Sequence, residues 1–188
     1  MLFRSDGIYD PPMEFHFATV WESIADVIGD NTAVVHGDRR FTWTQYDERA
    51  ARVAAAYTAA GLGPDSKIGL YLYNGNEYLE GMLGAFKARV APFNVNYRYV
   101  AEELLYLLRD AGARGVVYHA AFAPLLAEVL PSLPGLDVLV QVEDESGHPL
   151  LPGAIDYERA IAEASPERPD LAWSPDDLYC IYTGGTTG

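Results

Sequence analysis

The stretch Asp177-Leu178-Tyr179-Cys180-Ile181-Tyr182-Thr183-Gly184-Gly185-Thr186-Thr187-Gly188 joins a short apolar run directly to a loop of glycines and threonines. Residues 178–182 combine aromatic, aliphatic and β-branched side chains with almost no polar interruption. Such a run is typical of a strand that is buried on both faces of a parallel sheet. The stretch therefore predicts a parallel sheet whose last strand ends in a loop of unusual composition.

The loop after this strand contains three glycines within residues 184–188. Glycine has no Cβ to hold a phosphate away from the backbone, and it allows conformations in which successive N–H groups point at one anion. Thr183, Thr186 and Thr187 add hydroxyl donors. From the residues alone, two interpretations are open: a phosphate-binding loop and a flexible Gly/Thr turn. If the loop binds phosphate, a Walker loop, G-x-x-x-x-G-K-[ST], is one pattern it could open.

Helix and strand patterns alternate along the rest of the chain. Helices are expected at residues 19–28, from the Thr42 cap to Gly61, from an Asn74 cap through Phe86, and at 101–111, 122–130 and 154–164. Strands are expected at 67–73, 91–95, 115–118, 136–142 and 178–182, with a hairpin of 33–36 and 40–42 around Gly37-Asp38. This order implies βαβ units, and hence an α/β fold with a mostly parallel sheet and helices on both faces.

Two local signals refine this picture. Thr42 followed by Gln45 forms a capping box, which predicts a helix start. Gly75, Gly81 and Gly84 fall within a helical pattern, where each weakens an exposed helix by roughly 1 kcal/mol. We therefore expect them to permit close packing of this helix on the sheet.

Composition limits the classes of function. The 188 residues are 49% hydrophobic, enough for one globular domain, and carry a formal net charge of -14. That charge argues against nucleic acid and anionic membrane surfaces as partners. No apolar run approaches the length of a membrane span. Cys180 is the only cysteine, which excludes an internal disulfide and fits a reducing compartment, so a cytoplasmic location is expected.

Three segments carry a resemblance to a known family. Tyr182 to Gly188 fits the pattern Y-T-[SG]-G-T-T-G-x-P-K at all seven available positions. Residues 41–46 are similar to [FL]-T-Y-x-[EQ]-L, and residues 87–98 to K-A-G-A-x-x-x-P-x-N-x-x-[RY], with Arg89 and Val90 in place of Gly-Ala. Over about residues 19–188 the chain resembles the adenylate-forming, AMP-binding enzyme superfamily, and within it the acyl-CoA synthetases of the fatty-acid–CoA ligase type.

The resemblance implies an activity and a site. Such enzymes use ATP, Mg²⁺ and coenzyme A to convert a carboxylic acid, here a fatty or related lipid acid, into an acyl-AMP and then a thioester. The cofactor-binding residues carried over are Thr183, Gly184, Gly185, Thr186, Thr187 and Gly188, as part of the ATP site. No catalytic residue and no metal ligand of the family falls within this chain.

The resemblance also implies a domain organisation. Residues 1–188 correspond to the N-terminal portion of an AMP-binding domain, with 1–17 as an N-terminal arm and 143–176 as a surface excursion. The remainder of the large domain and a C-terminal domain would be absent, so the chain alone is expected to be inactive. Homo-oligomerisation stays open. The alternatives are an acyl-AMP ligase that feeds a carrier protein, a Walker-type NTPase and a non-catalytic α/β binding module.

Overall fold

The computed structural model describes residues 16–174 and 176–182. The helices are α1 (Phe17–Ile28), α2 (Trp43–Ala59), α3 (Asn76–Lys87), α4 (Ala101–Ala111), α5 (Ala123–Val129) and α6 (Tyr157–Glu163), with 3₁₀ turns at Ala120–Phe122 and Leu130–Ser132. The strands are β1 (Thr32–His36), β2 (Arg39–Thr42), β3 (Lys67–Tyr71), β4 (Ala91–Asn94), β5 (Gly115–His119), β6 (Val138–Val142) and β7 (Ile155–Asp156). Among the described residues, no helix has the length and apolarity needed to cross a membrane.

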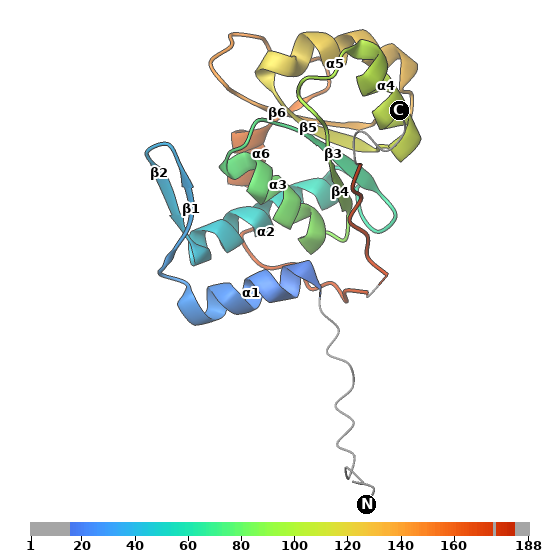
Figure 1. The fold of residues 1–188 in the computed structure, drawn as a ribbon. Coiled ribbons are helices and arrows are strands. Elements are labelled where there is room, and N and C mark those ends of the chain that lie inside the picture. The colour runs from blue at the N-terminus through green and yellow to red at the C-terminus, as the bar shows by residue number, and fades with distance from the viewer. Residues whose placement is uncertain (1–15, 175, 183–188) are drawn as a thin grey trace, which may run out of the picture.

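Five strands form one sheet in the order β4-β3-β5-β6-β7, and every neighbouring pair is parallel. Leu70 of β3 lies opposite Asn94 of β4 on one side and Val117 of β5 on the other. The antiparallel hairpin of β1 and β2 stands apart and projects from the body of the molecule (Figure 1). The predicted α/β fold with a mostly parallel sheet is confirmed.

Helices cover both faces of the sheet. Alternate residues of β3 divide between two cores: Ile68 and Leu70 pack with α2, α3 and α6, whereas Tyr71 packs with α4 and α5. Helices α4 and α5 accordingly lie on one side of the strands, and α2 and α3 on the other (Figure 1). Because both faces are buried, the strands read as nearly continuous apolar runs in the sequence.

Local capping signals determine where the helices begin. Thr42 and Gln45 form the predicted capping box of α2, with reciprocal hydrogen bonds of 3.2 Å and 2.9 Å. Phe17, predicted to belong to an arm, is instead the first residue of α1, because the His16 imidazole accepts a hydrogen bond from the Ala18 amide at 3.1 Å. Helix α3 is capped by Gly75 rather than by Asn74, since the extended cap conformation falls one residue later than predicted.

The range 143–176 is not entirely a surface excursion. It contains β7, which extends the sheet beside β6, and α6, which begins at Tyr157 rather than at Ala154. Tyr157 and Ile161 are only 2% and 3% exposed and pack in the core with α2. A two-residue strand is too short to show a period in the sequence, so β7 escaped prediction.

The predicted last strand is a second correction. Residues 178–182 form no strand and make a single parallel bridge, Cys180 to Phe93 of β4. Leu178 and Ile181 are 62% and 69% exposed. The apolar run is therefore not buried on both faces, and among the described residues it has only β4 as a strand neighbour.

A network of buried charges joins the helices on the α2 face. The Lys87 ammonium is fully buried and pairs with the carboxylates of Glu22 in α1 and Asp47 in α2, the latter at 2.8 Å. Arg168 pairs with Asp47 and with Asp26, each at 2.8 Å. Lys87 therefore has a structural role. Each buried charge needs its partners, since an unpaired ion in the interior is strongly unfavourable.

Gly84 lets α3 approach α2 rather than the sheet. A Cβ at this position would lie 2.5 Å from Val53 Cγ1 and 3.0 Å from the Ala50 carbonyl oxygen, both in α2. At Gly81 a Cβ would meet Leu70 of β3 at 3.2 Å and Tyr57 of α2 at 3.3 Å. Close packing was correctly predicted, but at Gly84 its partner is a helix.

We expect Gly84→Ala to lower the free energy of unfolding by on the order of 1–3 kcal/mol, because the added methyl group overpacks the α2–α3 contact. Gly135→Ala is the matched control, since a Cβ there has no atom within 4 Å. Urea unfolding of both variants gives the comparison. Equal stabilities would show that α2 and α3 separate without penalty.

Candidate functional site

The carboxyl ends of β3, β4, β5 and β6 meet at one edge of the sheet, because these strands are parallel. Ligands of open α/β sheets bind outside this edge. The segments that leave it are the ones after Tyr71, Asn94, His119 and Val142. A ligand is therefore expected at this edge of the sheet, the carboxyl edge.

An aromatic cluster of Tyr73, Tyr97, His119 and Phe122 covers part of the carboxyl edge. The Tyr73 ring lies 5.1 Å from Tyr97, 5.4 Å from His119 and 4.8 Å from Phe122, measured between centroids. Tyr73 and Tyr97 are 43% and 42% exposed, whereas His119 is buried. The cluster thus presents partly exposed ring surface to solvent, suited to apolar or planar groups.

His119 holds this cluster through its neutral imidazole. Its Nδ1 accepts a hydrogen bond from the Tyr73 amide at 3.1 Å, which requires an unprotonated Nδ1. Burial lowers the pKa of His119 below its ordinary value of 6.5, although the carboxylates of Asp144 and Glu77 act in the opposite direction. The neutral form is therefore the one that the folded protein favours.

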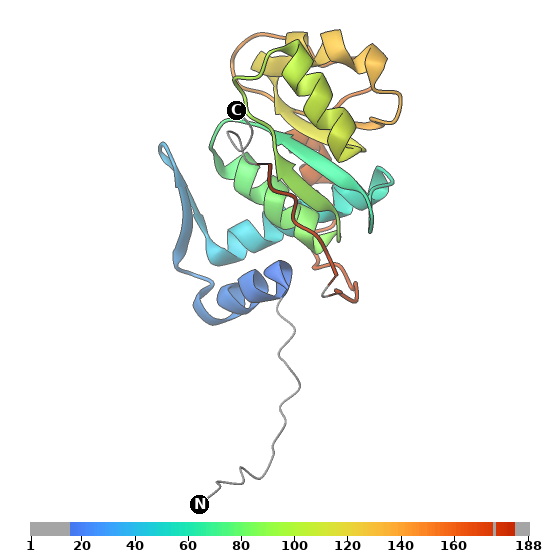
Figure 2. The same cartoon turned by 45° about the vertical axis from the view of Figure 1, so that its right-hand side comes forward.

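The segment of residues 176–182 runs alongside β4 toward the carboxyl edge. The Cys180 amide donates to the Pro92 carbonyl at 3.1 Å, and the bridge to Phe93 is parallel. Both views show the red segment following β4 (Figure 2). Tyr182 Oη donates to Asp110 Oδ2 of α4 at 2.9 Å, and burial followed by this bond raises the pKa of Tyr182 to about 12.

The six predicted ATP-site residues, Thr183, Gly184, Gly185, Thr186, Thr187 and Gly188, lie outside the described residues. What the structure places is the segment that leads to them. At Cys180 this segment is parallel to β4 and is therefore directed at the carboxyl edge. Cys180, which lies in the predicted buried strand of residues 178–182, is only half-buried beside β4.

Asp177 at the start of this segment makes contacts that the sequence did not reveal. Arg89 Nη2 donates to its Oδ1 at 2.8 Å, and His16 Nε2 lies 3.3 Å from its Oδ2. Burial raises the pKa of the Asp177 carboxyl, but the Arg89 hydrogen bonds and the neighbouring positive charge outweigh burial and hold the pKa below its usual range. The sequence held one indication that Arg89 is unusual. It stands between a predicted helix and a predicted strand, where the chain must turn without a glycine.

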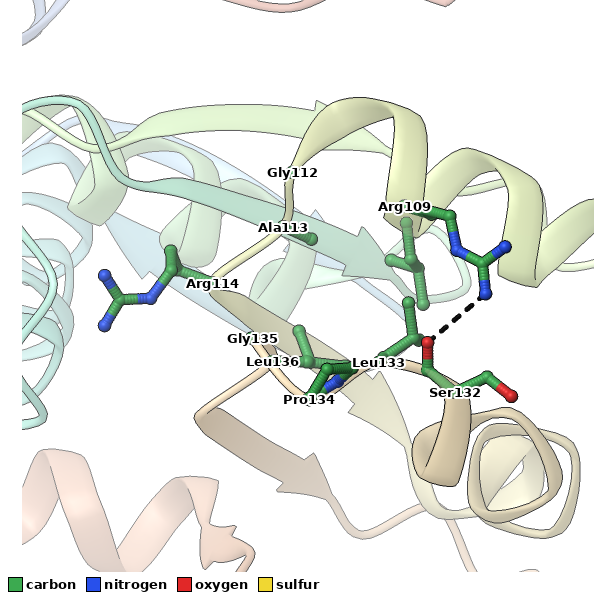
Figure 3. Close-up of a pocket in the computed structure, with 10 residues that line it drawn as sticks. Arg109, Gly112, Ala113, Arg114, Ser132, Leu133, Pro134, Gly135 and Leu136 are labelled. Atoms are coloured by element: carbon green, nitrogen blue, oxygen red, sulfur yellow. Dashed lines mark hydrogen bonds between the residues drawn. The ribbon is translucent and has the colours of Figure 1, made fainter.

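Two cavities lie away from the 176–182 segment. One, of about 240 Å³, is at the opposite edge of the sheet between α4 and the turn that precedes β6 (Figure 3). Arg109 Nη2 donates across it to the Ser132 carbonyl at 3.4 Å, and the Arg114 guanidinium extends away from Arg109. None of the predicted site residues lines it.

The second cavity, of about 360 Å³, lies between the β1–β2 hairpin and the start of α3. It borders the carboxyl edge through Asn74 and Gly75, and His36 closes its hairpin side. Arg39 bonds both the His36 imidazole at 3.0 Å and the Glu77 carboxylate at 2.9 Å, which fixes the hairpin on α3. Within the described ranges, no three His, Cys, Asp or Glu side chains gather as a metal site would require.

The parallel sheet, its helical layers and the segment along β4 define the N-terminal subdomain of adenylate-forming enzymes. The solved anthranilate CoA ligase AuaEII, in complex with anthranoyl-AMP, superposes with a TM-score of 0.83 at 25% identity, over 95% of this chain and 34% of that one. Residues 21–188 match the AMP-binding enzyme family, so the chain belongs to that family. The resemblance seen in the sequence is confirmed.

Two relatives are similar over nearly the whole chain. Identity is 50% over 192 residues to the medium-chain acyl-CoA ligase Mig of Mycobacterium avium, covering 95% of this chain and 35% of that protein. It is 37% over 177 residues to the 3-oxocholest-4-en-26-oate–CoA ligase of Rhodococcus rhodochrous, covering 94% and 32%. The chain thus spans about a third of the length of these relatives.

We expect the carboxyl edge to lose stability in acid. Because the folded-state pKa of His119 lies below 6.5, the unfolded chain binds the proton more readily, and stability falls as pH drops below 6.5. His119→Asn keeps an acceptor for the Tyr73 amide but does not titrate. Its free energy of unfolding, measured between about pH 8 and pH 5, should fall less steeply than that of the wild type, by on the order of 1 kcal/mol for one hydrogen bond. Superimposable pH profiles would show that His119 keeps its acceptor in acid.

Proposed function

We propose that this chain is part of an ATP-dependent acyl-CoA synthetase, an acid–thiol ligase that activates a carboxylic acid as acyl-AMP and transfers the acyl group to coenzyme A. The observation that carries the proposal is the 50% identity, over 95% of the chain, to a protein named a medium-chain acyl-CoA ligase. The second relative is named for a steroid carboxylate. Both names support a lipid carboxylic acid as the substrate.

The loop of residues 183–188 is proposed to hold the β- and γ-phosphates of ATP. Its glycine amides and threonine hydroxyls are uncharged donors that suit phosphate oxygens. They would stabilise the charge that develops as pyrophosphate leaves, which is electrostatic and positional catalysis rather than acid–base chemistry. Mg²⁺ would arrive as the counter-ion of the ATP phosphates.

The path of the preceding segment supports this assignment. Residues 177–182 run parallel to β4 and lead toward the carboxyl edge, where α/β sheets bind nucleotides. The formal net charge of -14 means that a polyanion must be held by local donors rather than by a general basic field. A loop of amides and hydroxyls at that edge would meet both conditions.

By the same resemblance, residues 1–188 form the N-terminal portion of an AMP-binding domain. The groups that bind adenine, ribose and the acyl chain, and the lysine of adenylation, would belong to sequence after Gly188. The 188 residues alone are therefore proposed to be inactive, so activity must be measured on the full-length protein.

The function is tested by supplying the full-length protein with Mg-ATP, coenzyme A and octanoic, decanoic or lauric acid. Release of AMP and pyrophosphate with formation of the acyl-CoA, identified by mass, is the expected result. Acyl-AMP that accumulates until a carrier protein is added would assign the acyl-AMP ligase instead. Formation of ADP and phosphate would indicate a Walker-type NTPase. If none of these products formed, a non-catalytic binding module would be indicated.

We expect Thr186→Ala to slow adenylation by roughly 10- to 100-fold, because it removes one donor to a charged acceptor that is worth on the order of 1.5–3 kcal/mol. Pyrophosphate exchange measures this step. Thioester formation from pre-made acyl-adenylate should hardly change, since pyrophosphate has already left.

Thr58→Ala is the matched control for this variant, because the Thr58 hydroxyl bonds only within α2, to the Ala54 carbonyl at 3.0 Å. Its two half-reactions should both match the wild type. If Thr186→Ala slowed both half-reactions equally at unaltered thermal stability, the loop would act in both steps and its assignment to the leaving phosphates would be wrong.

A further inference from the structure

Three residues contact the Asp177 carboxylate: Arg89, Ser174 and His16. Arg89 Nε donates to both carboxylate oxygens, at 3.1 Å and 2.9 Å, in addition to the Nη2 bond to Oδ1. The Ser174 amide donates to Oδ2 at 3.3 Å. The side chains of Arg89 and Asp177 are 22% and 13% exposed, so the pair is largely shielded from water. Such forked, partly buried pairs are geometrically specific, unlike exposed ion pairs.

His16 supports the same carboxylate as a neutral donor. Its Nδ1 accepts from the Ala18 amide, which leaves the ring proton on Nε2, 3.3 Å from Asp177 Oδ2. Burial is the largest influence on this imidazole and lowers its pKa, in spite of the Asp177 charge. The Trp173 ring lies 5.7 Å from His16 and fixes the ring plane. The start of α1 and the chain before Asp177 therefore meet at this carboxylate.

Arg89 has an unfavourable backbone conformation. Its φ of 57° lies in the left-handed region, where a Cβ crowds the following carbonyl and glycine is preferred. Arg89 stands in the turn between the end of α3 and the start of β4. From this turn the Arg89 guanidinium reaches Asp177.

The Arg89–Asp177 pair and the bridge at Cys180 hold the segment at two different points. Cys180 is opposite Phe93, and the Arg89–Asp177 pair lies on the N-terminal side of this bridge: Asp177 is three residues before Cys180, and Arg89 is four residues before Phe93. Leu178 lies between Asp177 and Cys180, and Ile181 follows Cys180. The side chains of both residues are mostly exposed. The apolar contacts of the segment are few: the Tyr179 ring lies 5.8 Å from Phe86 and 6.3 Å from Phe17, and Cys180 packs against the core. Its place along β4 therefore depends on these contacts together with the Asp177 contacts, the Cys180 bridge and the Tyr182 bond.

We propose that Arg89 is a positioning residue for adenylation: through Asp177 it sets the register of residues 177–182 along β4, and so the place of the phosphate-binding loop that follows Tyr182. This inference rests on the proposed function of the loop. A slip of one residue along β4 would displace the loop by about 3.3 Å. Misplacement by about 1 Å is enough to slow a positioned reaction by roughly 100-fold.

The test is Arg89→Gly in the full-length protein, because glycine removes the guanidinium and also suits the left-handed backbone, so folding is preserved. Pyrophosphate exchange should slow by roughly 10- to 100-fold, with a raised KM for ATP. Thioester formation from pre-made acyl-adenylate should stay within about twofold of the wild type, because the loop's phosphates have left. Arg89→Lys should recover part of the exchange rate, since it restores the charge without the fork.

Two further measurements separate positioning from general stability. In a double-mutant cycle with Asp177→Asn, the double variant should be no slower than the slower single variant, because both remove one interaction. Arg114→Gly is the matched control: Arg114 pairs with Asp137 at 2.8 Å, but the two side chains are about half exposed and lie at the opposite edge of the sheet. Its exchange rate should equal that of the wild type.

Normal pyrophosphate exchange by Arg89→Gly would overturn this inference and leave the proposed function intact. So would an equal loss of both half-reactions together with a lowered Tm, which would assign Arg89 to the stability of the fold. A wild-type protein that forms no acyl-adenylate would overturn the proposed function, and this inference with it.

Discussion

Parallel pairing of β3, β4, β5 and β6 brings the carboxyl ends of four strands to a single edge of the sheet. Each return from one strand to the next must then cross a face of the sheet, and the crossings after β3 and β4 are the helices α3 and α4. Both faces become buried in this way. The same constraint brings the segments that follow these strands to the carboxyl edge, where they form the aromatic cluster. The segment that leads to residues 183–188 is directed at the same edge.

Helix α3 links the buried core to this edge. Its first turn borders the cavity beside the β1–β2 hairpin, and its last residue, Lys87, is the cation of the buried network that joins α1 and α2. Two residues farther on, Arg89 reaches the segment beside β4. Because Lys87 must satisfy two carboxylates in the interior, the end of α3 is held firmly, and the turn that presents Arg89 is held with it.

The segment of residues 177–182 differs in kind from the strands of the sheet. Those strands are held by ladders of hydrogen bonds and by apolar burial on both faces, whereas this segment has one bridge and several side-chain contacts. Ion pairs and single hydrogen bonds are individually weak but directional. Such contacts suit the role proposed for this segment, in which its position matters more than its contribution to stability.

The sequence by itself determined the elements whose signals are local. Thr42 with Gln45 predicted the start of α2, and the helical period of residues 101–111 predicted the extent of α4. The alternation of apolar runs with helical periods predicted the parallel sheet, because capping and periodicity depend only on near neighbours. The sequence also supplied the family, through the pattern that begins at Tyr182. Only the tertiary structure decided that residues 178–182 make one bridge instead of a buried strand, that β7 joins the sheet, and that Asp177 meets Arg89 and His16. Those outcomes depend on which surfaces lie beside each residue after folding, and partners 88 positions apart, as Arg89 and Asp177 are, leave no local pattern.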